Sequence, residues 1–539
     1  MTTFFDRHQA LLQDARKALA DRGFWAPFAE IPSETIYGAG SRAAGQAAFD
    51  ALKGRPFALP GHPETGRAGS EESPFGGALD ITYPSADPAT LIAAAQGAAQ
   101  ALAEATPEAR IGALIEALVR LNARSFLIAH ATQHTTGQAF AMAFQAGGPH
   151  AQDRALEAVA LAWEEMTRFP AQALWEKPQG KAAALRLEKH WTLVPMGVAL
   201  TIGCNTFPTW NGYPGIFASL ATGNPVIVKP HPRAILPLAL TVQVLRAVFA
   251  EAGLPADAIL LAADTAEAPV TQALATDPAV RIIDYTGGTE FGGWLRAHAR
   301  QARLFTEEAG VNTVTILGAP DFVGMCDNLA FSLALYSGQM CTAPQTILVP
   351  AGGIDSDLGH KTPDEVGRGL ADALDRLLAD PARAAGVLGA VANPATAARM
   401  EALRQGARVI RDGRPMLLAA EGDDPVAQRE CFGPVAFLVP CADAETALER
   451  ATALARERGA ITAALYDTDE ARIARAIPAF ARAGVNLSIN LTGAIYVNQS
   501  AAFSDFHVTG ANPAGNACLT DPAFVAPRFT RAMWRRQIA

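Results

Sequence analysis

The segment from residue 198 to residue 253 decides the fold class. It contains the apolar runs VALTIG (198–203) and PVIVKP (225–230), followed by ILPLALTVQVLRAVFAEAG (235–253). The two short runs have the length of buried strands, and the longer stretch has the apolar spacing of a helix. Strands that alternate with helices are typical of βαβ units, in which helices cover a parallel sheet. We therefore predict an α/β protein.

The rest of the chain extends this pattern. A second alternation of strand and helix signals runs from residue 312 to about residue 490. Outside the two alternating regions we expect an amphipathic helix at 5–22, a loop-rich segment at 53–85 that is dense in Gly, Pro and Ser, Ala-rich helices from 87 to 170, a strand or hairpin at 171–195, and an irregular tail at 499–539.

Composition excludes several classes of protein. The chain has 539 residues, of which 50% are hydrophobic and 18% are charged, so it can bury large cores and is not disordered. The net charge of −9 argues against a nucleic-acid partner. No run of apolar residues is long enough to span a membrane and no secretory signal is recognised, so we expect a cytoplasmic protein. The six cysteines form no CxxC pair and the histidines are scattered, so we predict no metal site.

The segment LALYSGQMCTAPQTILVP (333–350) is the most informative for chemistry. An apolar helix ends near Gly338, Cys341 follows among small residues, and then a strand begins. Small neighbours let a substrate approach, and a thiol at such a position can serve as a nucleophile once it is deprotonated. The alternative is a buried structural cysteine, which is the commoner role.

Two other segments carry weaker signals. Glu308 lies where one apolar strand ends and another begins, and a carboxylate there can act as a general base on water. Gly287 and Gly288 join a strand to a helix, where they allow an anion to approach the helix amides. Lys229 closes the strand PVIVKP and can reach a ribose or a phosphate. Each feature alone is also compatible with an ordinary exposed loop.

Taken together, the motifs identify a family resemblance. The motifs occur in the order and at nearly the spacing that is standard in the NAD(P)-dependent aldehyde dehydrogenase superfamily, which the chain resembles over roughly residues 85–500. The segments TFPTWNGYPG (206–215) and FSDFHVTGANPAGNA (503–517) resemble the phenylacetic-acid-degradation branch of that superfamily. The superfamily resemblance rests on residues 201–232, EAGLPADA (251–258), DYTGGTEFGG (284–293), TEEAG (306–310), SGQMCT (337–342) and ECFGPV (430–435).

The resemblance implies a fold and a domain plan. It implies an aldehyde dehydrogenase-like α/β fold, with a Rossmann-type cofactor domain, an α/β catalytic domain and a small oligomerisation hairpin. The implied boundaries are an N-terminal extension (1–85), an NAD(P)-binding domain (86–170 and 192–310), a catalytic domain (311–498) and oligomerisation segments (171–191 and 499–539).

The resemblance also assigns roles to residues. Cys341 becomes the nucleophile and Glu308 the general base. On the cofactor side, Lys229 would hold the adenosine ribose, Gly287 and Gly288 would lie beside the pyrophosphate, Glu430 would bind the nicotinamide ribose and Phe432 would pack near the nicotinamide ring.

Two departures from the family pattern concern catalysis. Thr206, not Asn, precedes Phe207, and Asn205 lies one position earlier, so either the Asn205 amide or the Thr206 hydroxyl supplies the oxyanion donor beside the Cys341 amide. Val311 replaces a glycine and can crowd the base.

A third departure concerns the cofactor. No acidic residue directly follows Lys229, whereas His231 and Arg233 can pair with a 2′-phosphate. We therefore expect NADP or NAD, with NADP favoured.

These assignments predict the oxidation of a small-molecule aldehyde to a carboxylic acid through a thiohemiacetal and a thioester on Cys341. The branch suggests a semialdehyde in aerobic phenylacetate degradation, either free or CoA-bound. The alternatives are a dehydrogenase for another aromatic or aliphatic aldehyde, and a catalytically crippled relative that binds nucleotide. The resemblance further implies a homodimer or homotetramer, with no nucleic-acid or membrane partner.

Overall fold

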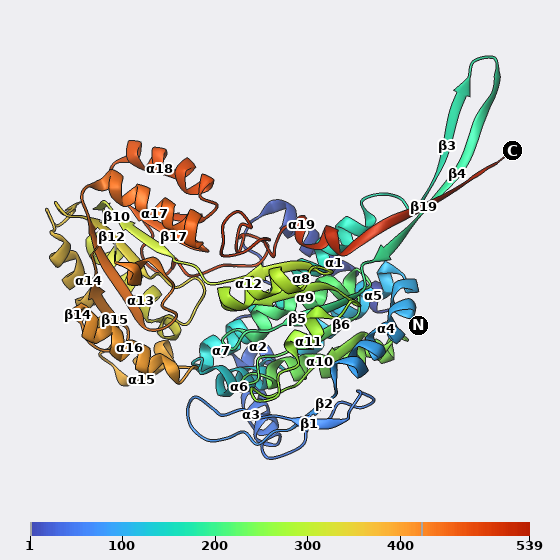
Figure 1. The fold of residues 1–539 in the computed structure, drawn as a ribbon, viewed down its shortest axis with the longest axis horizontal. Coiled ribbons are helices and arrows are strands. Elements are labelled where there is room, and N and C mark those ends of the chain that lie inside the picture. Colours follow the sequence, from blue (N-terminus) through green and yellow to red (C-terminus); the bar gives the residue numbers. More distant parts are fainter. Residues whose placement is uncertain (1–2, 422–423, 539) are drawn as a thin grey trace.

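Two sheets organise the molecule, which is described here by a computed structural model of residues 3–421 and 424–538. One sheet lies in the N-terminal half and the other in the C-terminal half, and the two bodies lie side by side (Figure 1). Both contain parallel strands with helices packed against them, so the predicted α/β class is confirmed. Within the described residues, no helix is both long and apolar enough to cross a membrane.

The first sheet has five strands in the order β7-β6-β5-β8-β9, and every pair is parallel. The order turns back at β5, which lies between β6 and β8, so the chain leaves β5 toward one side of the sheet and later returns on the other. Such a switch point places loops at the carboxyl ends of the strands around a crevice. The strands are β5 (Val198–Ile202), β6 (Val226–Lys229), β7 (Ile259–Leu261), β8 (Val280–Thr286) and β9 (Arg303–Glu307).

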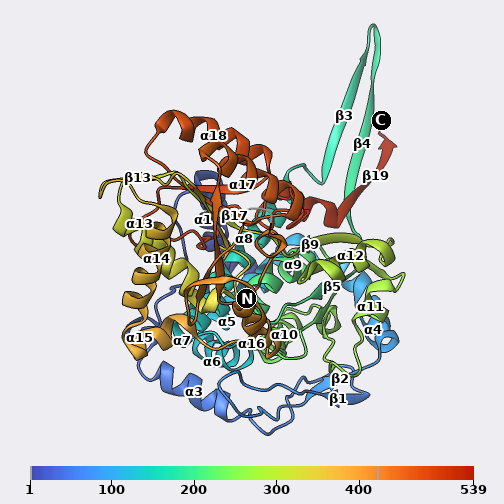
Figure 2. The same ribbon diagram turned by 60° about the vertical axis from the view of Figure 1, so that its left-hand side comes forward.

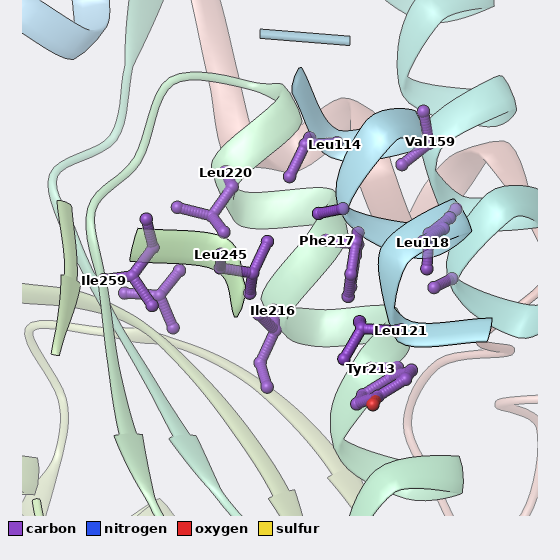
Figure 3. Close-up of a cluster of buried hydrophobic side chains, with 14 of the residues drawn as sticks. Leu114, Leu118, Leu121, Val159, Tyr213, Ile216, Phe217, Leu220, Leu245 and Ile259 are labelled. Carbon is purple, nitrogen blue, oxygen red and sulfur yellow. The ribbon is translucent and has the colours of Figure 1, made fainter. Parts of the chain in front are cut away.

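Helices from the N-terminal half cover this sheet. Ten labelled side chains from four helices and β7 meet in the large apolar cluster of Figure 3, and this packing accounts for the nearly unbroken burial of α9. The helices are α4 (Pro88–Glu104), α5 (Pro107–Asn122), α6 (Ser125–Thr136), α7 (Phe140–Gly147), α8 (Pro149–Thr167), α9 (Pro208–Ala221), α10 (Leu236–Glu251), α11 (Thr271–Thr276) and α12 (Thr289–His298).

The second sheet has seven strands in the order β14-β15-β16-β12-β10-β17-β18. Only the edge pair β14–β15 is antiparallel. The strands are β10 (Thr313–Ile316), β12 (Thr346–Pro350), β14 (Arg408–Arg411), β15 (Met416–Ala419), β16 (Val435–Cys441), β17 (Thr462–Tyr466) and β18 (Asn486–Ile489). The helices of this half are α13 (Phe322–Ala334), α14 (Pro363–Leu378), α15 (Pro381–Leu388), α16 (Ala395–Gly406), α17 (Ala444–Arg458) and α18 (Glu470–Arg482), and a two-stranded ladder joins β11 (Gly318–Ala319) to β13 (Asp355–Ser356).

A three-stranded antiparallel sheet projects from the body in both views (Figures 1 and 2). The hairpin of β3 (Gln172–Gln179) and β4 (Ala182–Pro195) matches the prediction for 171–195, and β19 (Phe529–Gln537) pairs along β4. The end of the tail is therefore a strand and not irregular. Its pairing partner lies more than 300 residues away, so no local pattern marked it.

The N-terminal residues wrap the first domain. They form α1 (Phe4–Asp21), α2 (Glu34–Tyr37), α3 (Ser41–Asp50) and the short pair β1 (Gly66–Ala68) and β2 (Tyr83–Ser85). The buried Glu71 carboxylate accepts hydrogen bonds from the backbone N–H groups of Ile235 and Leu236, at 2.6 and 3.0 Å. His62 Nε2 accepts from Leu261 N at 2.9 Å. The extension thus satisfies backbone donors that the end of β7 and the beginning of α10 would otherwise leave unpaired.

The remaining tail crosses between the two bodies before it reaches α19 (Pro522–Val525) and β19. Arg528 anchors it: the guanidinium is fully buried, lies against the rings of Phe305 and Phe524, and makes a bidentate pair with Asp284 at 2.9 and 2.6 Å. This pair fixes the tail to β8 of the first sheet.

Candidate active site

Cys341 lies on a tight connection between α13 and β12. A tight turn (Leu335–Gly338) precedes it, in which Tyr336, Ser337 and Gly338 have positive φ. An added Cβ on Gly338 would lie 2.5 Å from the carbonyl oxygen of Gly433, so only glycine fits there. Asn312 Nδ2 donates to the carbonyl oxygens of Cys341 and Ala343, at 2.7 and 3.0 Å. The backbone that carries the thiol is therefore held by side chains.

A three-residue cluster surrounds the thiol. Cys341 Sγ lies 3.9 Å from His507 Nε2, and that nitrogen lies 3.1 Å from Glu307 Oε1. One possible ligand atom from each of the three residues lies within 4.8 Å of the others, a spacing that would also suit a metal ion. Asn211 Nδ2, on α9, donates to Glu307 Oε2 at 3.1 Å. A nucleophile, a carboxylate and an imidazole thus meet in a buried space between the two bodies.

Electrostatics within the cluster set the protonation states. Burial, together with the neighbouring Glu307 carboxylate, raises the pKa of the Cys341 thiol well above its usual value. Burial alone would raise the pKa of Glu307 as well, but the His507 ring and hydrogen bonds from His507, Cys341 and Asn211 hold that pKa below its usual value. The resting site therefore holds a protonated thiol next to an ionised carboxylate.

Glu308, which the sequence assigned as the base, faces elsewhere. Its carboxylate pairs with the guanidinium of Arg296, on α12, with Arg296 Nη2 at 3.2 Å from Oε2. An added Cβ on Gly292 would lie 2.3 Å from the Glu308 carboxyl carbon, so the carboxylate packs directly on α12. Glu307, one residue earlier, is the carboxylate that the structure brings to Cys341. Side chains alternate between faces along a strand, and β9 ends at Glu307, so this register separates the two.

The two candidate oxyanion residues lie at the beginning of α9. Asn205 is half-buried, and its Oδ1 has no hydrogen-bond partner among the described residues. The Thr206 carbonyl oxygen accepts from Gln138 Nε2 at 2.8 Å, which fixes that peptide. Neighbouring Cys204 packs in one small apolar cluster with Met340, the residue before Cys341. Both candidates thus lie at the thiol end of the site.

The expected ribose lysine has a partner that sequence reasoning missed. Lys229 ends β6, and its buried Nζ lies 2.7 Å from Asp264 Oδ1 and 2.6 Å from the Pro230 carbonyl oxygen. Asp264 follows β7, the neighbouring strand, so the two side chains meet at the carboxyl edge of the sheet. His231 Nδ1 accepts from Arg233 N at 3.2 Å, and burial, with Lys229 and Arg233 nearby, lowers the pKa of His231 to about 4. At neutral pH the ring therefore carries no charge.

The glycine turn opens the N-terminal end of α12. Gly287 N donates to the Glu307 carbonyl oxygen at 3.0 Å, so this turn is joined directly to the end of β9. An added Cβ on Gly288, the residue that caps α12, would meet nothing within 4 Å. Free space before a helix N-terminus suits the pyrophosphate of a dinucleotide.

A small pocket lies beside the Cys341 segment. Glu430 and Phe432 line it opposite Gly338 and Met340. Burial raises the pKa of Glu430 to about 7, although its carboxylate accepts from the Gly310 backbone. Glu430 and Phe432 thus lie on the same pocket as the residues on either side of Gln339.

The arrangement of a thiol nucleophile, a buried carboxylate and a Rossmann-type sheet edge defines a dehydrogenase-like site. The chain belongs to the aldehyde dehydrogenase family, whose model matches residues 71–512.

Several individual proteins of known name are similar to this chain. A crystal structure of an NAD-dependent aldehyde dehydrogenase from Burkholderia multivorans is 49% identical, with a TM-score of 0.97, and the match covers 100% of both chains. A 3,4-dehydroadipyl-CoA semialdehyde dehydrogenase from Aromatoleum evansii is 28% identical over 333 residues, which is 54% of this chain and 60% of that protein. An alpha-ketoglutaric semialdehyde dehydrogenase 2 from Azospirillum brasilense is 29% identical over 57% of this chain and 59% of its own length. The matches thus span about 60% of these two curated relatives.

Proposed function

We propose that this protein oxidises an aldehyde to a carboxylic acid with NAD or NADP, using Cys341 as the nucleophile and Glu307 as the base. The observation that carries the proposal is the contact cluster of Cys341, Glu307 and His507. The cluster favours Glu307 for the role that the sequence resemblance gave to Glu308. Family membership and the Burkholderia multivorans relative support the nicotinamide cofactor.

Proton movements follow from the protonation states. The thiol of Cys341 passes its proton to the Glu307 carboxylate as Sγ forms a bond to the aldehyde carbon. The raised pKa of Cys341 means that this transfer, and not a standing thiolate, activates the sulfur. The oxyanion is stabilised by the Cys341 backbone N–H together with Asn205 or Thr206. The nicotinamide ring, when bound, supplies the hydride acceptor that converts the thiohemiacetal to a thioester. After Glu307 has released its proton, it takes one from water, which hydrolyses the Cys341 thioester to the acid.

On the cofactor side, Lys229 and Asp264 would hold the adenosine ribose, the Gly287–Gly288 turn the pyrophosphate, and Glu430 and Phe432 the nicotinamide end. Lys229 is already paired with Asp264, and His231 is neutral, which leaves the Arg233 guanidinium as the cation of this turn that could meet a 2′-phosphate. These contacts favour NAD over the NADP expected from the sequence. The Burkholderia multivorans relative, an NAD-dependent enzyme, supports the same preference.

For the substrate, we favour a semialdehyde, either free or CoA-linked. The names of the curated relatives, one of which acts on a CoA-linked semialdehyde, support this class. A step in aerobic phenylacetate degradation remains the specific proposal that the sequence resemblance carries. The projecting sheet of β3, β4 and β19 exposes Leu174, Trp175, Met533 and Trp534, which supports a homodimer or homotetramer. A cytoplasmic location is part of the same proposal.

A single-turnover assay tests the chemistry. Excess enzyme is mixed with NAD or NADP and a panel of semialdehydes and simple aldehydes, and the formation of reduced nicotinamide is followed. We expect a burst in the wild type that is lost in Cys341→Ala. Cys441→Ala is the matched control, because that buried thiol lies on β16, where its sulfur faces the Val439 carbonyl oxygen. A burst that survives in Cys341→Ala would overturn the assignment of the nucleophile. Nucleotide binding without a burst from any aldehyde would favour the non-catalytic alternative.

A further inference from the structure

His507 comes to the site from the C-terminal tail, which the sequence had assigned to oligomerisation. The ring is 2% exposed and its edge meets Trp210, on α9, with ring centroids 4.5 Å apart. Asn486 Nδ2 donates to the Phe506 carbonyl oxygen at 2.7 Å, which holds the backbone immediately before His507.

The loop before His507 is also anchored from α8. Arg154 Nη2 donates to Ser500 Oγ at 2.6 Å, and its guanidinium lies 5.2 Å from the centroid of the Trp210 ring. Arg154 is itself buried and paired with Glu157 at 3.0 Å. Residues from both bodies therefore fix the position of the imidazole.

The contacts of the ring define which nitrogen carries a proton. An ionised carboxylate accepts hydrogen bonds only, so Nε2, at 3.1 Å from Glu307 Oε1, must be the donor. Nδ1 is buried and has no partner among the described residues. The contact with Glu307 is therefore made through Nε2, and Nδ1 takes no part in it.

We propose that His507 is a positioning residue that holds the Glu307 carboxylate against Cys341 through its Nε2–H. The proposal rests on the function proposed above. Before proton transfer, the Nε2–H group donates a hydrogen bond to the Glu307 carboxylate. As Glu307 takes the thiol proton and Sγ bonds to the aldehyde carbon, negative charge develops transiently on Cys341 Sγ, 3.9 Å from the same nitrogen. One fixed donor thus faces first the carboxylate and then the reacting sulfur, and no proton leaves the imidazole.

The surroundings predict a pH signature. Cys204 and Glu430 are titratable groups near the Cys341 thiol, and each raises its pKa. The Arg154 guanidinium lies over the Trp210 ring, which in turn packs against His507. Glu308 faces away from the cluster and pairs with Arg296. Without the Nε2 donor, Glu307 would keep only Asn211 and the thiol as partners while its burial stays the same. Its pKa would rise, so a larger share of Glu307 would be protonated at a given pH and unable to act as a base.

Three variants of the full-length protein test this role. His507→Phe keeps a ring against Trp210 but removes the donor. His507→Gln can place an amide N–H near the position of Nε2, whereas the amide of His507→Asn matches Nδ1 and falls short of Glu307. The exposed His360→Gln is the matched control, since it lies in the β13 loop, where it contacts Asp355. Melting temperatures identify any variant that fails to fold.

The first readout is the acid limb of kcat/KM against pH. We expect it to move to higher pH by about one unit or more in the Phe and Asn variants, and to stay close to the wild type in the Gln variant. Wild-type acid limbs in folded Phe and Asn variants would overturn the proposal. So would a Gln variant displaced as far as the Asn variant, because ring packing alone would then explain the effect. If the Phe variant does not fold, the Gln and Asn pair decides.

The second readout needs neither aldehyde nor cofactor. The alkylation of Cys341 by iodoacetamide is followed against pH by mass spectrometry of the peptide that contains it. The same order of acid limbs is expected, because Glu307 accepts the thiol proton. If the wild type oxidised no aldehyde, the proposed function would fail while this comparison still gave a result. If the alkylation profiles of all four proteins coincided, the positioning role would fail.

Discussion

The carboxylates of Glu307 and Glu308 lie on opposite sides of the end of β9. Glu307 contacts His507 and Asn211 in the space beside Cys341, whereas Glu308 pairs with Arg296 on α12. The separation has a chemical consequence, because of these two carboxylates it is Glu307 that lies within reach of the Cys341 thiol. The ion pair between Glu308 and Arg296 also connects α12, which begins at the glycine turn, to the end of β9.

The two glutamates can be distinguished by substitution. We expect Glu307→Gln to lower steady-state turnover by about 10²- to 10⁴-fold, because general-base catalysis is lost. Glu308→Gln removes an ion pair and leaves the base in place, so it should lower turnover far less. Steady-state rates and burst amplitudes of the two variants check this. A larger loss in Glu308→Gln than in Glu307→Gln would return the base role to Glu308.

Substitution also distinguishes the two residues that could donate a hydrogen bond to the oxyanion. Removal of one oxyanion donor costs about 10²- to 10³-fold in rate, so either Asn205→Ala or Thr206→Val should show that loss in kcat. Asn205 Oδ1 is unpartnered among the described residues, so the amide is not committed to a structural bond there, and we expect the Asn205 variant to be the impaired one. A small effect in both variants would mean that the Cys341 N–H acts with a different partner.

Cofactor choice depends on Asp264. Its carboxylate lies 2.7 Å from Lys229 Nζ, so Asp264→Asn should free the ammonium to meet a 2′-phosphate. A charge-assisted hydrogen bond is worth enough to raise the NADP-to-NAD ratio of kcat/KM by about tenfold or more. Asp257→Asn makes the same charge change beside Arg246 and is the control. An unchanged ratio in Asp264→Asn would show that this pair does not select the cofactor.

Cofactor affinity should depend on pH through Glu430. Burial raises the pKa of Glu430 to about 7, so the carboxylate is ionised above that pH and protonated below it. The ionised form accepts charge-assisted hydrogen bonds from ribose hydroxyl groups, and protonation removes the charge and so weakens these bonds. We expect the KM for the cofactor to rise by about tenfold between pH 8 and pH 6. Glu430→Gln, measured over the same range, should flatten this dependence, and a slope as steep as that of the wild type would contradict it.

Stability of the first domain should depend on Glu71. Its carboxylate satisfies two backbone donors at the beginning of α10, and Glu71→Ala would leave both buried without acceptors. We expect a loss of about 1–3 kcal/mol in the free energy of unfolding. Glu72→Ala is the matched control because that neighbouring side chain is exposed. Urea unfolding followed by fluorescence checks the difference, and equal midpoints would exclude the capping role.

Local pattern was sufficient wherever a segment's own periodicity or turn chemistry decided its structure. The alternation around residues 198–253 predicted strands and helices that are present, because apolar runs of strand length can be buried only in a covered sheet. The prediction of a strand or hairpin at 171–195 was confirmed as well, and there the signal was the alternation of polar and apolar residues. Two short helices at 34–37 and 41–50 were not predicted, since they depend on packing against α6 more than on their own pattern.

The sequence by itself determined the family, the α/β fold and the position of Cys341, because each is carried by contiguous residues. Tertiary structure decided which glutamate faces the thiol, since one residue of strand register moves a side chain to the opposite face. It alone brought His507 to Glu307 across 200 residues of chain, and Asp264 to Lys229 across neighbouring strands. Such contacts arise from the packing of distant segments. Hydrogen bonds between distant segments produce no periodic pattern in the sequence from which they could be predicted.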